Sequence, residues 1–130
     1  MSYEDIRSKL QSLALQFPDL ILLENADSKY GIPSMVDCNS SKCVVDIVTL
    51  TDRSTPPDDK AQVYISGALH GNERIGPHVA YYIIEYLAMN FGKDAYLTHM
   101  LRTRELIITP MTNAYGFATN QRREAVLMQG

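Results

Sequence analysis

A histidine and a glutamate lie three positions apart, at His70 and Glu73, between an apolar run and a predicted helix. Imidazole nitrogen and carboxylate oxygen are both good zinc ligands, with bonds of about 2.0–2.2 Å. A catalytic zinc site of two histidines and one glutamate keeps a fourth position for a water whose pKa the metal lowers. Gly71 lets the backbone bend here without a Cβ clash, so both side chains can point at one ion. The pair therefore predicts two ligands of a hydrolytic metal centre.

This spacing alone is a weak motif, because a helix start can place a histidine and a glutamate in the same way. There the histidine donates a hydrogen bond and the glutamate interacts favourably with the helix dipole. The position favours the metal interpretation, since open α/β sheets bind ligands beyond the carboxyl ends of their strands. His78 and His99 fall on predicted helices and are interpreted as packing or surface residues.

The spacing of apolar residues predicts the elements that hold this pair. Ser2 and Asp5 resemble a capping box, so a helix is expected from about Tyr3 to Gln16. The remaining predictions are strands at 20–23, 44–50, 63–69 and 105–110, helices from 76 to 90 and from 95 to 102, a turn at 29–33, and loops at 51–60 and 112–130. Strand 63–69 is apolar almost throughout, which predicts burial on both faces. The order indicates an α/β domain with a mixed sheet and helices on both faces.

Composition excludes several classes of protein. The chain has 130 residues, 45% hydrophobic and 21% charged, which is typical of one globular domain. A net charge of -3 argues against nucleic-acid binding, and no apolar run is long enough to cross a membrane. The polar N-terminus lacks a signal-peptide pattern, which leaves a cytoplasmic protein or a mature secreted form open. Nothing in the sequence sets an oligomeric state.

Two cysteines, Cys38 and Cys43, are separated by a short polar segment. They could form a disulfide in an oxidising compartment, or remain two reduced thiols in a loop. Without another cysteine or histidine pair nearby they make a poor zinc site. The sequence also lacks a phosphate-binding glycine-rich loop and a Gly-x-Ser-x-Gly nucleophile motif.

Several segments in order resemble the zinc carboxypeptidase family. The segment 63–73, ending in His-Gly-Asn-Glu, looks like that family's zinc-binding segment, and 3–18 is similar to its first helix. Asn113 to Phe117 stands where the family usually reads Asn-Pro-Asp-Gly, and Ala114 and Tyr115 depart from that pattern. Arg122 to Glu124 lies where the family places a substrate-facing arginine.

The resemblance implies a zinc-dependent enzyme, with one Zn²⁺ per complete domain, that hydrolyses the C-terminal peptide bond of peptides or proteins. It implies zinc ligation by His70 and Glu73, and a catalytic and substrate-binding role for Arg123 or, as second choice, Arg122. A guanidinium suits this role because it is always charged and donates in a fork, although a solvated basic pair would look the same. The third ligand, a second histidine, and the general base, a glutamate, would lie downstream. Residues 1–130 are thus interpreted as the truncated N-terminal part of one domain.

Two other functions stay open. Deacylases of N-acyl amino acids also carry a His-Gly-Asn-Glu segment and resemble this fold. Alternatively, the chain is a truncated, non-catalytic binding module in which two ligands hold zinc only weakly.

Overall fold

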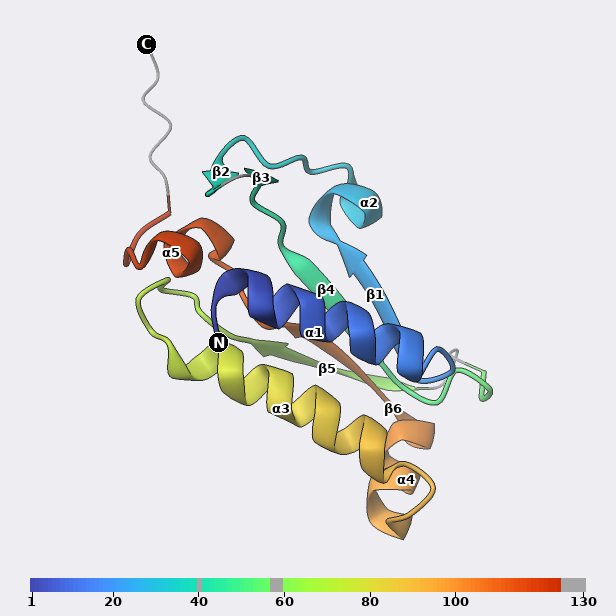
Figure 1. Ribbon diagram of the computed structural model, residues 1–130. Helices are drawn as coiled ribbons and strands as arrows, with labels where there is room; N and C mark the ends of the chain where they lie inside the picture. Colours follow the sequence, from blue (N-terminus) through green and yellow to red (C-terminus); the bar gives the residue numbers. More distant parts are fainter. Residues whose placement is uncertain (40, 57–59, 125–130) are drawn as a thin grey trace.

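The computed structural model describes residues 1–39, 41–56 and 60–124, which are built around a four-stranded mixed sheet (Figure 1). The strands, in spatial order, are β1 (Ile21–Asn25), β4 (Asp46–Leu50), β6 (Arg104–Thr109) and β5 (Ala61–Ser66). β4 is antiparallel to both of its neighbours, whereas β5 and β6 run parallel. The predicted α/β class with a mixed sheet is confirmed.

Three helices follow the predicted ones closely. They are α1 (Tyr3–Gln16), α3 (Ile75–Asn90) and α4 (Ala95–Thr103). α1 and α3 lie side by side over one face of the sheet, and α4 joins α3 to β6 (Figure 1). No helix among the described residues is both long enough and apolar enough to span a membrane.

The core forms where the two long helices meet the sheet. Val48, Leu50, Leu106 and Ile108 are paired across β4 and β6 and are all buried. Fully buried side chains from the helices meet them, namely Ile6, Leu10, Ile84 and Leu101. This core holds β6 in place. β6 in turn pairs with β5, at whose end the candidate site begins.

The burial predicted for strand 63–69 is wrong. The strand ends at Ser66, and Val63 and Tyr64 are 42% and 62% exposed. β5 stands at the edge of the sheet with a neighbour, β6, on one side only. Its apolar character suits a parallel strand covered on both faces, but in the described part of the chain α3 covers it only partly.

Two short helices stand where loop or turn was predicted. α2 (Ala26–Tyr30) starts at Asn25, whose side chain accepts a hydrogen bond from the Ser28 amide, and it ends at Gly31 with a φ of 64°. α5 (Ala114–Thr119) lies inside the segment predicted as loop from 112 onward. Helices this short carry too few apolar repeats to give a readable period.

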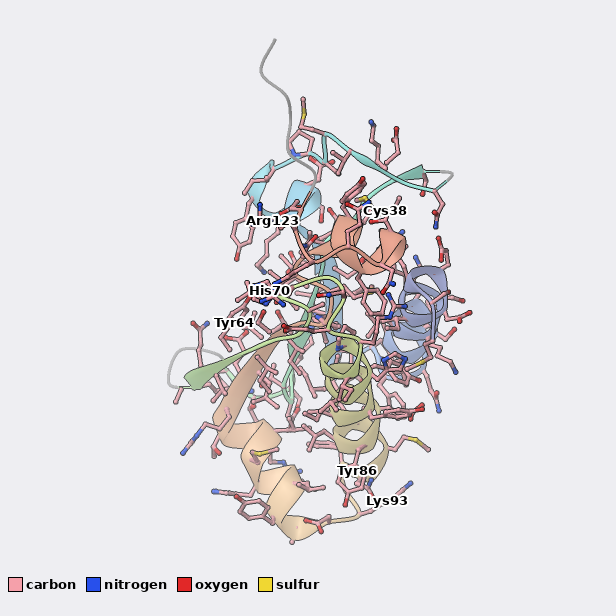
Figure 2. All side chains as sticks on the ribbon, turned by 90° about the vertical axis from the view of Figure 1, so that its left-hand side faces the viewer. Cys38, Tyr64, His70, Tyr86, Lys93 and Arg123 are labelled. Atoms are coloured by element: carbon pink, nitrogen blue, oxygen red, sulfur yellow. A yellow bond between two sulfur atoms is a disulfide. The ribbon has the colours of Figure 1, made fainter. Side chains whose placement is uncertain are left out.

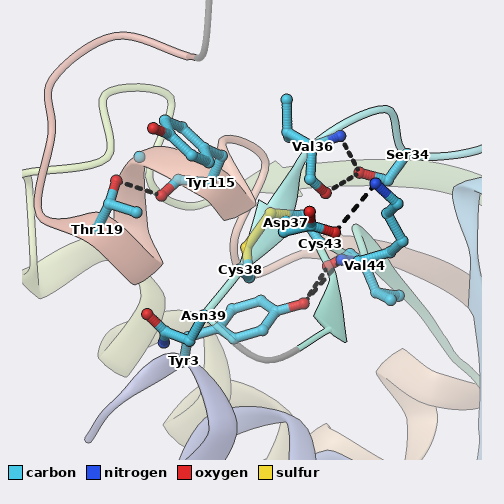
Figure 3. The surroundings of a disulfide bond; sticks show 12 residues. Tyr3, Ser34, Val36, Asp37, Cys38, Asn39, Cys43, Val44, Tyr115 and Thr119 are labelled. Carbon is cyan, nitrogen blue, oxygen red and sulfur yellow. Dashed lines mark hydrogen bonds and ion pairs between the residues drawn. A yellow bond between two sulfur atoms is a disulfide. The ribbon is translucent and has the colours of Figure 1, made fainter.

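Cys38 and Cys43 form a disulfide across the small hairpin of β2 (Asp37–Cys38) and β3 (Ser41–Lys42) (Figure 3). Both cysteines are buried, and β2 packs against α5. The Tyr3 hydroxyl ties the hairpin to α1, because it accepts a hydrogen bond from the Val44 amide at 2.7 Å. The hairpin therefore braces α5, which in turn packs against the candidate site.

Replacing both cysteines with serine is expected to lower the free energy of unfolding by about 2 kcal/mol, because a short closed loop no longer restricts the unfolded chain. Urea unfolding monitored by circular dichroism measures the difference. The unsubstituted chain in excess reductant is the matched control and should lose a similar amount. A double variant as stable as the oxidised chain would contradict the expectation.

Acid is expected to weaken α1 through its capping box. The Ser2 amide donates to the Asp5 carboxylate at 2.8 Å, and this backbone bond, with that from the Ser2 side chain, lowers the pKa of Asp5. The carboxylate therefore stabilises the fold above the unfolded pKa of about 3.9, and the contribution is lost as pH falls through the lower folded value. Asp5→Asn should flatten the loss of stability below about pH 4. An acid titration with the slope of the unsubstituted chain would show that Asp5 contributes nothing.

Candidate functional site

The candidate site begins where β5 ends, and backbone hydrogen bonds hold this turn to the segment after β6. The Gly67 amide donates to the Thr109 carbonyl at 2.9 Å, and the Asn113 amide donates to the Ala68 carbonyl at 3.0 Å. Ala68 has a φ of 48°, in the left-handed region that a residue with a Cβ enters at a cost. The sharp bend before His70 is therefore made by Ala68.

His70 and Glu73 converge as the metal hypothesis requires. His70 Nδ1 lies 3.1 Å from Glu73 Oε1, and the Glu73 amide donates to the His70 carbonyl in the same turn. Both side chains are open to solvent, with 41% and 56% of the side-chain surface exposed. Two atoms 3.1 Å apart can both lie about 2.0–2.2 Å from one ion, so the donor pair fits zinc.

Of the two candidate arginines, the structure brings Arg122 to the pair. Its Nη1 lies 3.1 Å from Glu73 Oε1, and its Nη2 lies 3.4 Å from His70 Nε2. Arg123, labelled with His70 in Figure 2, is exposed, and its side chain makes no hydrogen bond or ion pair with another described residue. Sequence position alone did not separate these neighbours, because adjacent side chains in an irregular segment point in unrelated directions.

Close backbone packing places the Arg122 segment beside the turn. The Gly71 amide donates to the Arg122 carbonyl at 3.2 Å, and the Asn113 side-chain amide donates to the same carbonyl at 3.4 Å. A Cβ on Gly71 would collide with the backbone of Gly116. Gly71 is thus required for this close approach, whereas the predicted role in bending the chain belongs to Ala68.

Asn113 and Gly116 shape the turn that starts α5. The Asn113 side chain accepts a hydrogen bond from the Gly116 amide at 2.7 Å and so caps the helix. Both residues are buried, and the Asn113 side chain bonds to the Gly116 amide and the Arg122 carbonyl rather than to His70 or Glu73. Their contribution to the site is positional.

Arg74 is a positioning residue that the sequence pattern did not reveal. Its Nη1 donates to the Phe117 carbonyl at 2.5 Å, and its guanidinium carbon lies 3.8 Å from the centre of the Phe117 ring. These contacts join the start of α3 to α5, and hence join the Glu73 turn to the segment carrying Arg122. An arginine directly after Glu73 is the only sequence signal for this role.

The described residues do not make up a complete metal centre. Within residues 1–39, 41–56 and 60–124, no group of three or more His, Cys, Asp or Glu side chains is arranged to hold a metal ion. His78 and His99 lie on α3 and α4, as predicted. The Met1 ammonium group donates to His78 Nε2 at 2.6 Å, and His78 Nδ1 donates to the Arg74 carbonyl at 2.6 Å. Two ligands and a guanidinium could orient a cation, a carboxylate or a polarised carbonyl.

A cavity of about 560 Å³ lies away from this pair, between α2 and the disulfide hairpin. Apolar groups of Ile32, Met35, Val36 and Val45 line much of it. None of His70, Glu73 and Arg122 borders the cavity, so its size carries no weight in assigning the chemistry.

Comparison with known proteins finds a matching family model and several carboxypeptidases. The family model described as zinc carboxypeptidase matches residues 40–127. Carboxypeptidase D of Mus musculus is 33% identical over 64 residues, which are 49% of this chain and 5% of that protein. Thrombin activatable fibrinolysis inhibitor superposes with a TM-score of 0.81 at 18% identity, over 99% of this chain and 31% of that one. Carboxypeptidase A from Helicoverpa armigera superposes with a TM-score of 0.78 at 18% identity, over 100% and 30%.

The chain thus spans about a third of the matched solved chains and a much smaller part of the curated relative. At 18% identity the two solved structures support a shared fold. The match to the family model over residues 40–127 supports membership of that family.

Proposed function

Because this chain belongs to the zinc carboxypeptidase family, we propose that it forms the N-terminal part of a domain that hydrolyses the C-terminal peptide bond of a peptide or protein. The observation that carries the proposal is the 3.1 Å approach of His70 Nδ1 to Glu73 Oε1 just beyond the carboxyl end of β5. This is where an open α/β sheet binds its ligands.

His70 and Glu73 would hold a single Zn²⁺ ion, which supplies a Lewis acid and an activated water. If the resemblance extends to the whole domain, a second histidine ligand and a glutamate base would come from sequence beyond Gly130. His70 and Glu73, with the turn that presents them, would be the part of this centre that the described residues supply, and their exposure leaves room for further ligands and substrate.

Arg122 is the better candidate for binding the substrate carbonyl, although Arg123 was the first choice from the sequence. Its guanidinium reaches both proposed ligands, so it can donate hydrogen bonds to an oxygen held beside them. A fixed positive charge there would stabilise the oxyanion that forms when the carbonyl is attacked. Arg123 would have to reorient to do the same.

Zinc binding by the chain tests the ligand assignment. We expect weak binding, because two side chains alone hold zinc poorly, and we expect His70→Ala and Glu73→Gln each to abolish it. Titration followed by NMR detects weak binding, and His99→Ala, which removes an exposed histidine on α4, is the matched control. Binding that survives both ligand variants would refute the assignment.

Activity tests the reaction in any longer form of the protein that includes the downstream segment. Release of a C-terminal residue from peptides should be measured beside hydrolysis of N-acyl amino acids. Cleavage of the peptides alone supports a carboxypeptidase, and cleavage of the N-acyl amino acids alone supports the deacylase alternative. If neither reaction occurs while zinc binds, the non-catalytic module becomes the better account.

A further inference from the structure

Arg122 closes a ring of three side chains over the proposed ligand pair. Its Nη1 lies 3.1 Å from Glu73 Oε1, its Nη2 lies 3.4 Å from His70 Nε2, and His70 Nδ1 lies 3.1 Å from the same Glu73 oxygen. Both His70 nitrogens and the Glu73 Oε1 atom are therefore engaged within the ring.

The Arg122 guanidinium bonds to the oxygen that a metal ion would need. A guanidinium can only donate and an ionised carboxylate can only accept, so Arg122 Nη1 donates to Glu73 Oε1. The same oxygen lies 3.1 Å from His70 Nδ1, and these two atoms are the proposed metal ligands. The guanidinium and a metal ion would therefore compete for one oxygen.

The guanidinium can leave the ring while its backbone stays in place. The Arg122 carbonyl is held by the Gly71 amide and the Asn113 side chain, as described above, whereas 56% of the Arg122 side chain is exposed. A long, exposed side chain on an anchored backbone can rotate without disturbing the fold.

We propose that Arg122 is a latch on the metal-binding pair. Its guanidinium competes with a divalent cation for Glu73 Oε1. Binding of the cation releases the guanidinium, which then faces the substrate carbonyl, so metal loading and substrate binding are coupled. The proposal rests on the metal pair of the proposed function and adds an order of events to it.

The test compares Arg122→Gln with Arg123→Gln in the intact 130-residue chain, because each removes one positive charge from the same segment. NMR of nitrogen-labelled histidine follows Zn²⁺ titration at His70, with His99 as an internal reference. Removing a unit charge this close to the site should tighten Zn²⁺ binding about tenfold in Arg122→Gln. Arg123→Gln should change it by less than about threefold. Arg122→Lys, which keeps the charge but loses the fork, should fall between them.

The outcomes separate the latch from the proposed function. Unchanged or weaker Zn²⁺ binding in Arg122→Gln, with Zn²⁺ still bound at His70, would overturn the latch and leave the metal pair in place. If Zn²⁺ instead leaves the His70 signals of every variant unperturbed, the metal pair itself is refuted, and the latch with it.

Discussion

Gly71→Ala is expected to lower the free energy of unfolding by about 1–3 kcal/mol and to abolish Zn²⁺ binding at His70. The new methyl group would overlap the backbone of Gly116 and the Gln121 carbonyl, and backbone atoms cannot rotate away as a side chain can. This overlap is relieved only if the His70 turn and the Arg122 segment move apart. That movement breaks the hydrogen bond from the Gly71 amide to the Arg122 carbonyl. Urea unfolding and the Zn²⁺ titration of His70 measure the two effects.

The control for this variant is Gly31→Ala, at the end of α2. A Cβ there meets nothing within 4 Å, but the φ of 64° makes alanine unfavourable. It should cost about 1 kcal/mol of stability and leave Zn²⁺ binding unchanged. If Gly71→Ala behaves in the same way as Gly31→Ala, the close approach does not matter to the site.

Phe117→Ala is expected to give the largest loss of stability, about 3–5 kcal/mol, because it empties a fully buried aromatic position. The Phe117 ring packs under the Arg74 guanidinium and lies edge-on to His78. Removing it leaves a cavity and frees Arg74, so α5 should loosen together with the segment that carries Arg122. Denaturant midpoints measure the stability, and the NMR signals of His70 report the effect at the site.

Leu15→Ala is the matched control for Phe117→Ala. Leu15 is an apolar residue on α1 that is 84% exposed, so its truncation should change stability by less than about 0.5 kcal/mol. A Phe117→Ala loss below about 1 kcal/mol would mean that α5 is not an integral part of the core.

The elements predicted correctly are those with strong local patterns. The capping box of Ser2 and Asp5 and the apolar repeat of α1 both lie within one continuous segment, and so do the β-branched residues of β4. Local backbone preference and the spacing of apolar residues favour such segments before any long-range contact forms. The sequence locates β5 but predicts its burial wrongly, because the exposure of a strand depends on which strands and helices lie beside it.

The candidate site divides in the same way. His70 and Glu73 are three residues apart, so one turn suffices to bring them together, and residue type and spacing revealed them. Arg122 is 52 positions from His70 and reaches it only because β6 pairs with β5 and returns the chain to the end of β5. No spacing rule specifies a contact of that kind.

The sequence by itself determined the α/β class, the three longer helices and the resemblance to zinc carboxypeptidases, and it singled out His70 and Glu73 as candidates. Only the tertiary structure decided that Cys38 and Cys43 are joined, that Ala68 makes the bend, and that the guanidinium over the pair belongs to Arg122. The reason is physical. Propensity and periodicity act between residues a few positions apart, whereas packing decides which distant backbones approach closely enough to place a side chain.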